Sequence, residues 1–323
     1  MSTALPLGDA KTAMGMLNVA VCIATYQRPT GLARLVQGLQ LLDVECGDAL
    51  SPEIIIVDND PAGSAGSLCA QLAREGRWQI TYIREPRKGT PFARNAVVRC
   101  ALERGADLLA FIDDDEAPDA TWLRELVLTM AHHAADIVAG PVLPEFEPDV
   151  PRWILKGGFF ELPRRPTGTQ LDRAFTNNVL VRAEVFSRVG RLFDERFLLG
   201  VGEDTDFFLR AVRAGCKIVW ANDAIVHEWI PASRTRVMWL LRRSYTIGIY
   251  WGQLRIARDL HRRLALRNLV KGMLWCPVSV FQGRHVAVRA LQLIATGVGY
   301  LSTRAGSWMN EHRDADANGL RGG

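Results

Sequence analysis

The stretch LLAFIDDDE, residues 108–116, decides the fold of this chain. Five apolar residues in a row predict a strand that is buried on both faces, as in a parallel sheet covered by helices. Four acids follow it at once, and ligands of open α/β sheets bind at the carboxyl ends of strands. The alternative is a solvated acidic turn in front of a helix, where the helix dipole favours acids.

Similar apolar runs occur on both sides of this stretch, with helical patterns between them. We expect strands at 18–25, 53–57, 80–84, 108–112 and 136–139, with helices after Pro29, around Leu68, and at 90–105 and 120–133. Further strands are expected at 175–181, 216–220 and 225–226, with a helix at 203–214. Strands that alternate with helices predict an α/β fold with a mostly parallel sheet flanked by helices.

The alternation stops at 140–172, where six prolines and four glycines predict a long loop. Loops of this length are usually lids or binding segments. From about Ala232 to Tyr300 the pattern is helical, with a break expected near Pro277. We therefore expect a first domain at 1–230, a basic amphipathic helical segment at 231–304 and a flexible tail at 305–323.

The distribution of charge divides the chain in the same way. Its 323 residues are 48% apolar and 23% charged, which excludes disordered and collagen-like classes. The net charge of +4 combines −7 in residues 1–230 with +12 in residues 231–304, where Asp259 is the single acid. A basic block indicates a nucleic acid, a membrane surface or an anionic ligand as partner. Nucleic acid is not expected, because no such binding motif is present and the acidic part repels a phosphate backbone.

Cysteine spacing and hydropathy limit the remaining classes. The six cysteines form no C-x-x-C motif, so we expect reduced thiols and neither a zinc site nor disulfides. The stretch from Met1 to Leu17 lacks the apolar core of a signal peptide. Residues 285–300 come nearest to a membrane-spanning helix, but Arg289 interrupts the apolar run. A spanning helix there is the alternative to a segment that lies on the membrane.

Nucleotide-binding motifs with glycine-rich loops are absent from the sequence. The first expected strand is followed by TYQRPTG (25–31), which is neither G-x-G-x-x-G nor the glycine-rich loop of a nucleotidyltransferase, and no P-loop occurs elsewhere. Any bound phosphates would therefore be held by a metal and basic residues. Four adjacent acids at a buried strand end repel one another unless a cation or hydrogen-bond donors are present. Their hard oxygen ligands suit Mg²⁺ or Mn²⁺.

Seven motifs, in order along the chain, carry a resemblance to a known family. They are VAVCIATYQRP (19–29), IIIVDND (54–60), KGTPFARN (88–95), FIDDDE (111–116), FTNNVLVR (175–182), GEDTDFFLR (202–210) and AIVHEW (224–229). Together they resemble glycosyltransferase family 2, and most of all its exopolysaccharide glucosyltransferases of the succinoglycan type. The resemblance covers about residues 18–245. It implies the GT-A fold in the first domain and a metal-dependent, inverting transfer of a hexose from a nucleotide diphosphate to an acceptor hydroxyl.

The resemblance also implies a role for each matching residue, and a solvated or helix-capping role is the alternative for each. Contacts to the nucleotide sugar are implied for Thr25, Tyr26, Arg28, Asp58 (to uracil), Lys88, Arg94, Asn95, Asp113, Asp114, Asn177 and Asn178. Ligands of Mn²⁺ or Mg²⁺ are implied for Asp115, Asp113 and His227. The implied catalytic acids are Asp204, as general base, and its neighbour Glu203.

The chemistry of inversion agrees with these roles. The acceptor hydroxyl loses its proton as it attacks, which requires a positioned base such as Asp204. The leaving diphosphate gains negative charge, which a cation and basic side chains stabilise. Arg242 and Arg243 are candidates to share that stabilisation, with membership of a basic surface as the alternative.

The basic segment interleaves arginines with large apolar residues between Val237 and Trp275. Such helices lie in anionic membrane interfaces, and the alternative is a helix pair that packs on the first domain. We expect a peripheral protein of the cytoplasmic face of the inner membrane, with UDP-glucose as donor and a lipid-diphosphate-linked saccharide as acceptor. The alternatives are another donor (UDP-galactose, UDP-N-acetylhexosamine or dTDP-rhamnose) or a non-catalytic sugar-nucleotide-binding protein.

Overall fold

The computed structural model describes residues 17–43, 50–197, 202–253 and 258–302. The expectations for the N-terminal stretch, for Cys46 and for the tail at 305–323 lie outside these residues. The chain divides into two compact units, residues 1–145 with 160–229 and residues 146–159 with 230–323. Each unit is described by itself.

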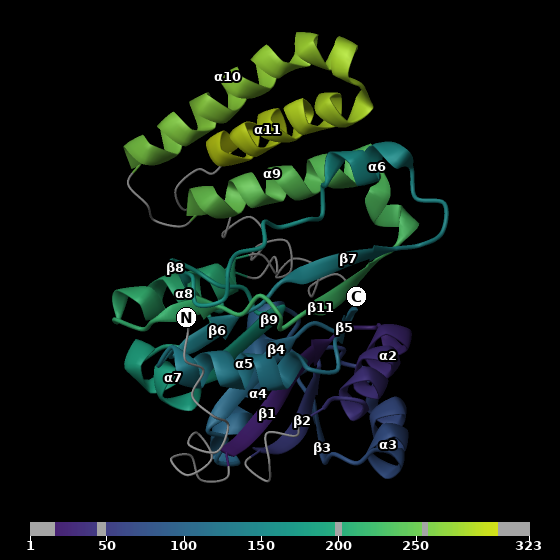
Figure 1. Cartoon of the computed structure of the whole chain (residues 1–323), viewed down its shortest axis with the longest axis vertical. Coiled ribbons are helices and arrows are strands. Elements are labelled where there is room, and N and C mark those ends of the chain that lie inside the picture. The colour runs from purple at the N-terminus through teal and green to yellow at the C-terminus, as the bar shows by residue number, and fades with distance from the viewer. Residues whose placement is uncertain (1–16, 44–49, 198–201, 254–257, 303–323) are drawn as a thin grey trace, which may run out of the picture. The chain divides into compact units, whose positions relative to one another are not determined.

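The first unit is built on an eight-stranded sheet with the order β3-β2-β1-β4-β9-β6-β10-β8 (Figure 1). The strands, with β7 and β11 in part in the second unit, are β1 (Leu17–Thr25), β2 (Leu50–Asp58), β3 (Ile80–Arg84), β4 (Leu108–Ile112), β5 (Glu116–Pro118), β6 (Ile137–Ala139), β7 (Val142–Phe146), β8 (Gln170–Leu171), β9 (Asn178–Arg182), β10 (Ile218–Trp220) and β11 (Val226–Ile230). The helices are α2 (Pro29–Gln40), α3 (Gly66–Glu75), α4 (Thr90–Glu103), α5 (Trp122–His132), α7 (Ala183–Val189) and α8 (Glu203–Arg213). The sequence prediction of an α/β fold with a largely parallel sheet is confirmed.

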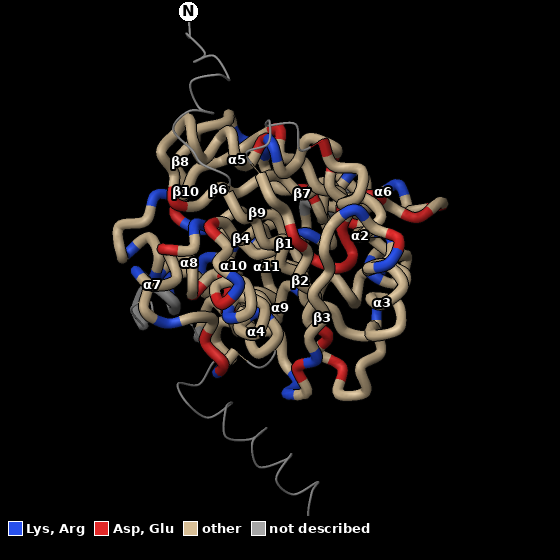
Figure 2. The backbone as a smooth tube through the Cα atoms, turned by 90° about the horizontal axis from the view of Figure 1, so that it is seen from below, with Lys and Arg blue, Asp and Glu red and all other residues tan. Residues whose placement is uncertain are grey.

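Helices cover both faces of this sheet, because successive residues of a strand point to opposite sides. Val19, Val21 and Ile23 of β1 belong to a core with the apolar residues of α2, α3 and α5. Ala20 and Cys22 belong to the opposite core, with α4, α7 and α8. Lys, Arg, Asp and Glu lie mainly in the helices and loops around the tan strands in Figure 2. The first unit is therefore a three-layer α/β/α structure.

Two details of the sheet differ from the sequence prediction. Strand β9 runs antiparallel to both β4 and β6, which hydrophobic patterning alone does not reveal, since a buried strand reads the same in either direction. The stretch 140–172, expected to be a loop, contains β7, β8 and the short helix α6 (Arg152–Gly157). A smaller sheet has the order β5-β11-β7, and its strand β5 is the next strand after β4 in the sequence.

The second unit contains α6, the 3₁₀ turn η1 (Ala232–Thr235) and the long helices α9 (Val237–Gln253), α10 (Arg258–Gln282) and α11 (Arg284–Ser302). Helix α11 packs against α9, α10 and α6. Its backbone approaches α9 closely, since a Cβ atom on Gly248 would lie 3.0 Å from the Cα of Gly299. Among the described residues, no helix combines the length and the apolar character that crossing a bilayer requires.

The expected break near Pro277 is wrong. Pro277 lies inside α10, where proline has no backbone N–H to donate to the preceding turn. The helix ends instead at Gln282, and the next residue, Gly283, has a φ of 98°, a conformation that glycine adopts without strain. The helical hairpin of α10 and α11 therefore turns six residues later than expected.

Candidate active site

The acidic run after β4 is a closed turn at the carboxyl edge of the sheet. The backbone N–H of Asp113 donates to Glu116 Oε2 at 2.8 Å, and the N–H of Glu116 donates to the carbonyl of Asp113 at 3.2 Å. Glu116 is buried, and burial together with the nearby Asp113 raises its pKa well above the ordinary value. Glu116 therefore shapes the turn that carries the acids. Sequence reasoning gave it no role, although it is the fourth acid of the run.

Asp114 is buried as well, and its partners come from the end of β1 and from the residues that follow it. The register of β1 against β4 brings the end of β1 opposite this turn. Thr25 Oγ1 donates to Asp114 Oδ2 at 2.7 Å, and Arg28 Nη1 donates to Asp114 Oδ1 at 2.9 Å. Arg28 Nη1 also lies 3.1 Å from Asp115 Oδ2. Burial raises the pKa of Asp114, and the positive charge of Arg28 opposes that effect. In this structure Thr25 and Arg28 thus hold the D-x-D turn.

Arg94 connects this turn to α8. It donates from Nη1 to Glu203 Oε1, and its Nη2 lies 3.6 Å from Asp113 Oδ1. Removal from bulk water raises the pKa of the partly exposed Asp113 to about 6, with Arg94 opposing this and Asp115 adding repulsion. The same guanidinium therefore neutralises acids from two elements that are distant in sequence.

Glu203 and Asp204 open α8 and differ in their surroundings. Glu203 is 1% exposed, and burial raises its pKa to about 7 against the opposing charge of Arg94. Its Oε2 has no hydrogen-bond partner among the described residues. Asp204 is half-buried, and its Oδ1 accepts from the N–H of Thr205 at 2.6 Å. The charge of Asp204 acts on Arg94 and on Asp113, so its carboxylate belongs to the same cluster.

The loop after β2 is tied together by its own acids. Asp58 is fully buried, and it accepts from the backbone N–H groups of Asp60 and Ala65 at 2.9 and 2.8 Å and from the hydroxyl of Tyr82 at 3.1 Å. Burial and the charge of Asp58 raise the pKa of Tyr82 to about 12. The Asp58 carboxylate therefore shapes the loop. Its contact with uracil stays a prediction.

Asn59, which sequence reasoning missed, fixes the following loop. Its Nδ2 donates to the carbonyls of Glu85 and Arg87 at 3.0 and 2.7 Å, and its Oδ1 accepts from the N–H of Gly89 at 2.9 Å. Next to Gly89, Lys88 Nζ lies 5.7 Å from the centre of the Tyr26 ring. Tyr26 is 40% exposed, so its ring offers a surface on which a planar base can stack.

Two of the predicted asparagines are buried, and their side-chain amides form hydrogen bonds with backbone groups. Asn95 donates to the carbonyl of Phe193 and accepts from its N–H, both at 2.9 Å. Asn178 donates to the carbonyls of Pro141 and Ala224 at 2.9 and 2.8 Å. The Oδ1 of Asn178 also accepts from the indole N–H of Trp122 at 2.8 Å. Both amides therefore join distant segments. The half-buried Asn177 stands at the turn before β9.

His227 lies in β11 between two carboxylates. Its Nε2 is 3.0 Å from Asp119 Oδ1, and its Nδ1 is 3.0 Å from Glu145 Oε1. Both ring nitrogens are thus engaged with carboxylates, and the role of His227 as a metal ligand stays a prediction. Within the described part of the chain, no three His, Cys, Asp or Glu side chains converge on a common metal position.

The residues nonetheless fit a cation that the substrate helps to hold. Mg²⁺ is commonly bound by one or two carboxylates together with substrate phosphates. Asp113 and Asp115 supply such oxygens at the sheet edge, and removal from bulk water raises the pKa of Asp113, to which repulsion from Asp115, Asp114 and Asp204 adds. Mn²⁺ accepts the same ligands.

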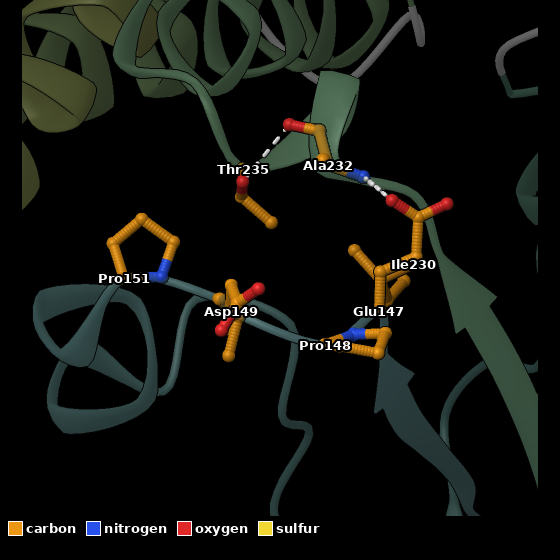
Figure 3. A pocket seen from close by; sticks show the side chains of 8 residues that line it. Glu147, Pro148, Asp149, Pro151, Ile230, Ala232 and Thr235 are labelled. Atoms are coloured by element: carbon orange, nitrogen blue, oxygen red, sulfur yellow. Dashed lines mark hydrogen bonds between the residues drawn. The ribbon is translucent and has the colours of Figure 1, made fainter.

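The remaining predicted residues belong to the second unit. Arg242 and Arg243 lie on α9, and the guanidinium of Arg243 lies 5.3 Å from the ring of Trp239. A small pocket of this unit lies between two segments, residues 147–151 and 230–235 (Figure 3). There the N–H of Ala232 donates to Glu147 Oε2, and Thr235 donates to the carbonyl of Ala232, both at 2.9 Å. None of the predicted site residues lines this pocket.

The three-layer α/β/α fold around a largely parallel sheet is the fold of GT-A glycosyltransferases. The family model described as "Glycosyl transferase family 2" matches residues 20–190, and "Glycosyl transferase family group 2" matches residues 108–309. The chain belongs to glycosyl transferase family 2. The prediction made from the seven motifs is confirmed.

Relatives and solved structures agree with this assignment. The chain is 34% identical to the succinoglycan biosynthesis protein ExoM of Rhizobium meliloti over 74% of this chain and 75% of that protein. It is 25% identical to the glycosyltransferase AglE of Haloferax volcanii over 69% of each chain. The crystal structure of S. aureus TarS 1–349 in complex with UDP-GlcNAc has a TM-score of 0.53 at 12% identity, covering 91% of this chain and 93% of that one. That likeness shows the fold.

Proposed function

We propose that this chain is an inverting glycosyltransferase that moves glucose from UDP-glucose to a hydroxyl of a lipid-diphosphate-linked oligosaccharide in exopolysaccharide or cell-surface polysaccharide synthesis. The observation that carries the proposal is the position of Arg94, which pairs with Glu203 and lies beside Asp113. It brings the start of α8, with Asp204, to the D-x-D turn. The similarity to a succinoglycan biosynthesis protein supports the choice of pathway class.

In the proposed reaction Asp204 is the general base. Its carboxylate accepts the proton of the acceptor hydroxyl as that oxygen bonds to the anomeric carbon and the bond from this carbon to the diphosphate oxygen breaks. Attack opposite the leaving group inverts the anomeric centre. A positioned base of this kind contributes about 10²- to 10⁴-fold to the rate. Arg94 balances the negative charge beside the base, and Glu203 fixes the position of Arg94.

Asp113 and Asp115 are the proposed ligands of Mn²⁺ or Mg²⁺, with His227 as a further candidate. When bound, the cation stabilises the charge that develops on the leaving diphosphate. Tyr26 and Lys88 are proposed to border the base, and Asn177 to border the sugar. Arg242 and Arg243 are proposed to assist the diphosphate. We further propose that the second unit attaches the protein peripherally to the cytoplasmic face of the inner membrane.

The same site also fits other donors, namely UDP-galactose, UDP-N-acetylhexosamine or dTDP-rhamnose. Non-catalytic sugar-nucleotide binding is the second candidate function, and the presence of the acids Asp204, Asp113 and Asp115 argues against it. Thermal unfolding with a panel of nucleotide sugars, each with and without Mn²⁺, tests the proposal. A ligand that binds the native state raises the unfolding temperature by mass action. We expect the largest increase with UDP-glucose and Mn²⁺ together, and no increase with any nucleotide sugar would contradict the proposal.

A further inference from the structure

Helix α10 exposes a face of large apolar side chains, which a helix of a soluble domain usually buries. Its side toward α11 carries small residues: Ala265 is fully buried, and a Cβ atom on Gly272 would lie 2.8 Å from the carbonyl oxygen of Ala290. Leu269 also lies on that side, close to Gly297 of α11, whereas four other large apolar residues are exposed by 42–66%, namely Leu266, Val270, Met273 and Leu274. These four residues are called the α10 strip here. Soluble helices turn such residues toward the core.

The α10 strip is one continuous face with cations beside it. Positions 266, 270, 273 and 274 have the i, i+4, i+7, i+8 spacing of a single helix face. Arg263, Arg267 and Lys271 are exposed and follow one another at intervals of four, so they form a parallel row next to the strip. Lys271 Nζ lies 5.2 Å from the ring of Trp275, which is 40% exposed. The sequence contains no Asp or Glu from residue 260 to residue 310.

This combination selects one kind of partner. An exposed apolar strip marks a binding surface, and a row of cations with no acid nearby selects a negatively charged one. Tryptophan, lysine and arginine are the residues that anchor helices at the headgroup level of a bilayer. A second copy of the chain would place its own cations against these cations, which disfavours a self-complementary contact.

We propose that the α10 strip inserts into the headgroup region of an anionic lipid bilayer, with Arg263, Arg267 and Lys271 facing the lipid phosphates. The inference deepens the proposed function, on which it rests, because it names the surface of the second unit that meets the membrane. It predicts that α10 lies in the plane of the interface.

Flotation of the full chain with vesicles tests the inference. We expect binding to phosphatidylcholine vesicles that contain phosphatidylglycerol, and weaker binding to phosphatidylcholine alone. Leu266→Glu/Leu274→Glu is expected to weaken binding at least about tenfold, since charges replace the inserted side chains. Arg263→Gln/Arg267→Gln/Lys271→Gln is expected to weaken it about a hundredfold, because each of the three cations near an anionic surface contributes about fivefold.

Leu41→Glu is the matched control, because Leu41 is 77% exposed at the end of α2 in the first unit. This control and both α10 variants should keep the wild-type unfolding temperature. Wild-type flotation by Leu266→Glu/Leu274→Glu would overturn the inference. So would a wild-type dimer that does not float and that this variant dissociates, since the strip would then bind a second copy. Transfer to an acceptor in detergent reports the proposed function separately: if transfer fails while flotation is lost only in the α10 variants, the function is wrong and the inference stands.

Discussion

Arg94 and Glu203 form an ion pair between side chains that are 12% and 1% exposed and 109 residues apart in sequence. Arg94 belongs to the first turns of α4, and Glu203 opens α8. Both helices cover the same face of the sheet. The pair therefore fixes the start of α8, and with it Asp204, relative to the D-x-D turn.

Replacement of Arg94 tests how much this pair stabilises the fold. Arg94→Met leaves the Glu203 carboxylate buried without its cation, which costs about 3–5 kcal/mol for such pairs. We expect that loss in the free energy of unfolding from urea titrations at pH 8. Arg99→Met is the control on the same helix, where Arg99 pairs with the exposed Glu195 at 3.7 Å, and its loss should stay within about 1 kcal/mol. Equal losses for both variants would contradict the burial argument.

The pH dependence of the free energy of unfolding tests the raised pKa of Glu203. Burial raises its pKa from 4.5 in the unfolded chain to about 7, so the folded state binds this proton more tightly. The resulting stabilisation is complete below pH 4.5 and is lost as the pH rises through 7. Between pH 5 and pH 8 the wild type should therefore lose about 2 kcal/mol of unfolding free energy relative to Glu203→Gln. A difference between the two proteins that does not change with pH would show that the pKa is not raised.

Alanine substitutions of the neighbouring residues Asn177 and Asn178, at the start of β9, should affect different properties of the protein. Asn178→Ala removes the partner of the Trp122 indole N–H and of the Ala224 carbonyl in the core, whereas the Pro141 carbonyl still accepts from the N–H of Val226. We expect about 2–3 kcal/mol of destabilisation, since each buried unsatisfied group costs about 1–3 kcal/mol. Asn177→Ala should change stability by less than about 0.5 kcal/mol and should raise KM for the donor. Denaturant unfolding and steady-state kinetics on both variants test this prediction. A large loss of stability in Asn177→Ala, with a raised KM for the donor in a stable Asn178→Ala, would contradict it.

Removal of the cation tests the ligand role of Asp115. Chelation with EDTA should abolish the rise in unfolding temperature that the donor causes. Asp115→Asn should lower the apparent affinity for Mn²⁺ at least about tenfold, because loss of an outer-sphere partner alone costs that much. Asp119→Asn, next to His227, is the comparison, and a larger effect there would assign the cation to the His227 side of the site.

The sequence patterns predict the layers of the fold and the location of the site well. The apolar run of β4 and the acids behind it specify the sheet edge, and the acids of α8 are found beside them. The antiparallel direction of β9 was missed. Many antiparallel strands alternate apolar and polar residues, but β9 is buried on both faces and is apolar throughout its middle, as a parallel strand would be. The position of Pro277 inside α10 was missed, because a proline within a helical pattern is usually the sign that a helix ends or kinks there.

In the candidate site, sequence motifs predict which residues are present but not which groups those residues contact. Motifs identify Asn95 and Asn178 but not their partners, which are backbone groups of Phe193, Pro141 and Ala224. Such contacts depend on the tertiary fold and leave no periodic signal. Glu116 and Asn59 were missed for the same reason, since each acts on the backbone of a loop. The nucleotide contacts expected for Thr25 and Arg28 stay a prediction, and the sequence did not reveal that both side chains hydrogen-bond to Asp114.

The measurement that tests the central claim most directly is sugar transfer by Asp204→Asn. The amide keeps the shape of the side chain and cannot accept the acceptor proton, so turnover should fall about 10²- to 10⁴-fold while donor binding, followed by thermal unfolding, is retained. Asp206→Asn, on the same helix and paired with Arg210 at 2.8 Å, should keep turnover near the wild-type level. Wild-type turnover by Asp204→Asn would contradict the assignment of Asp204 as the general base.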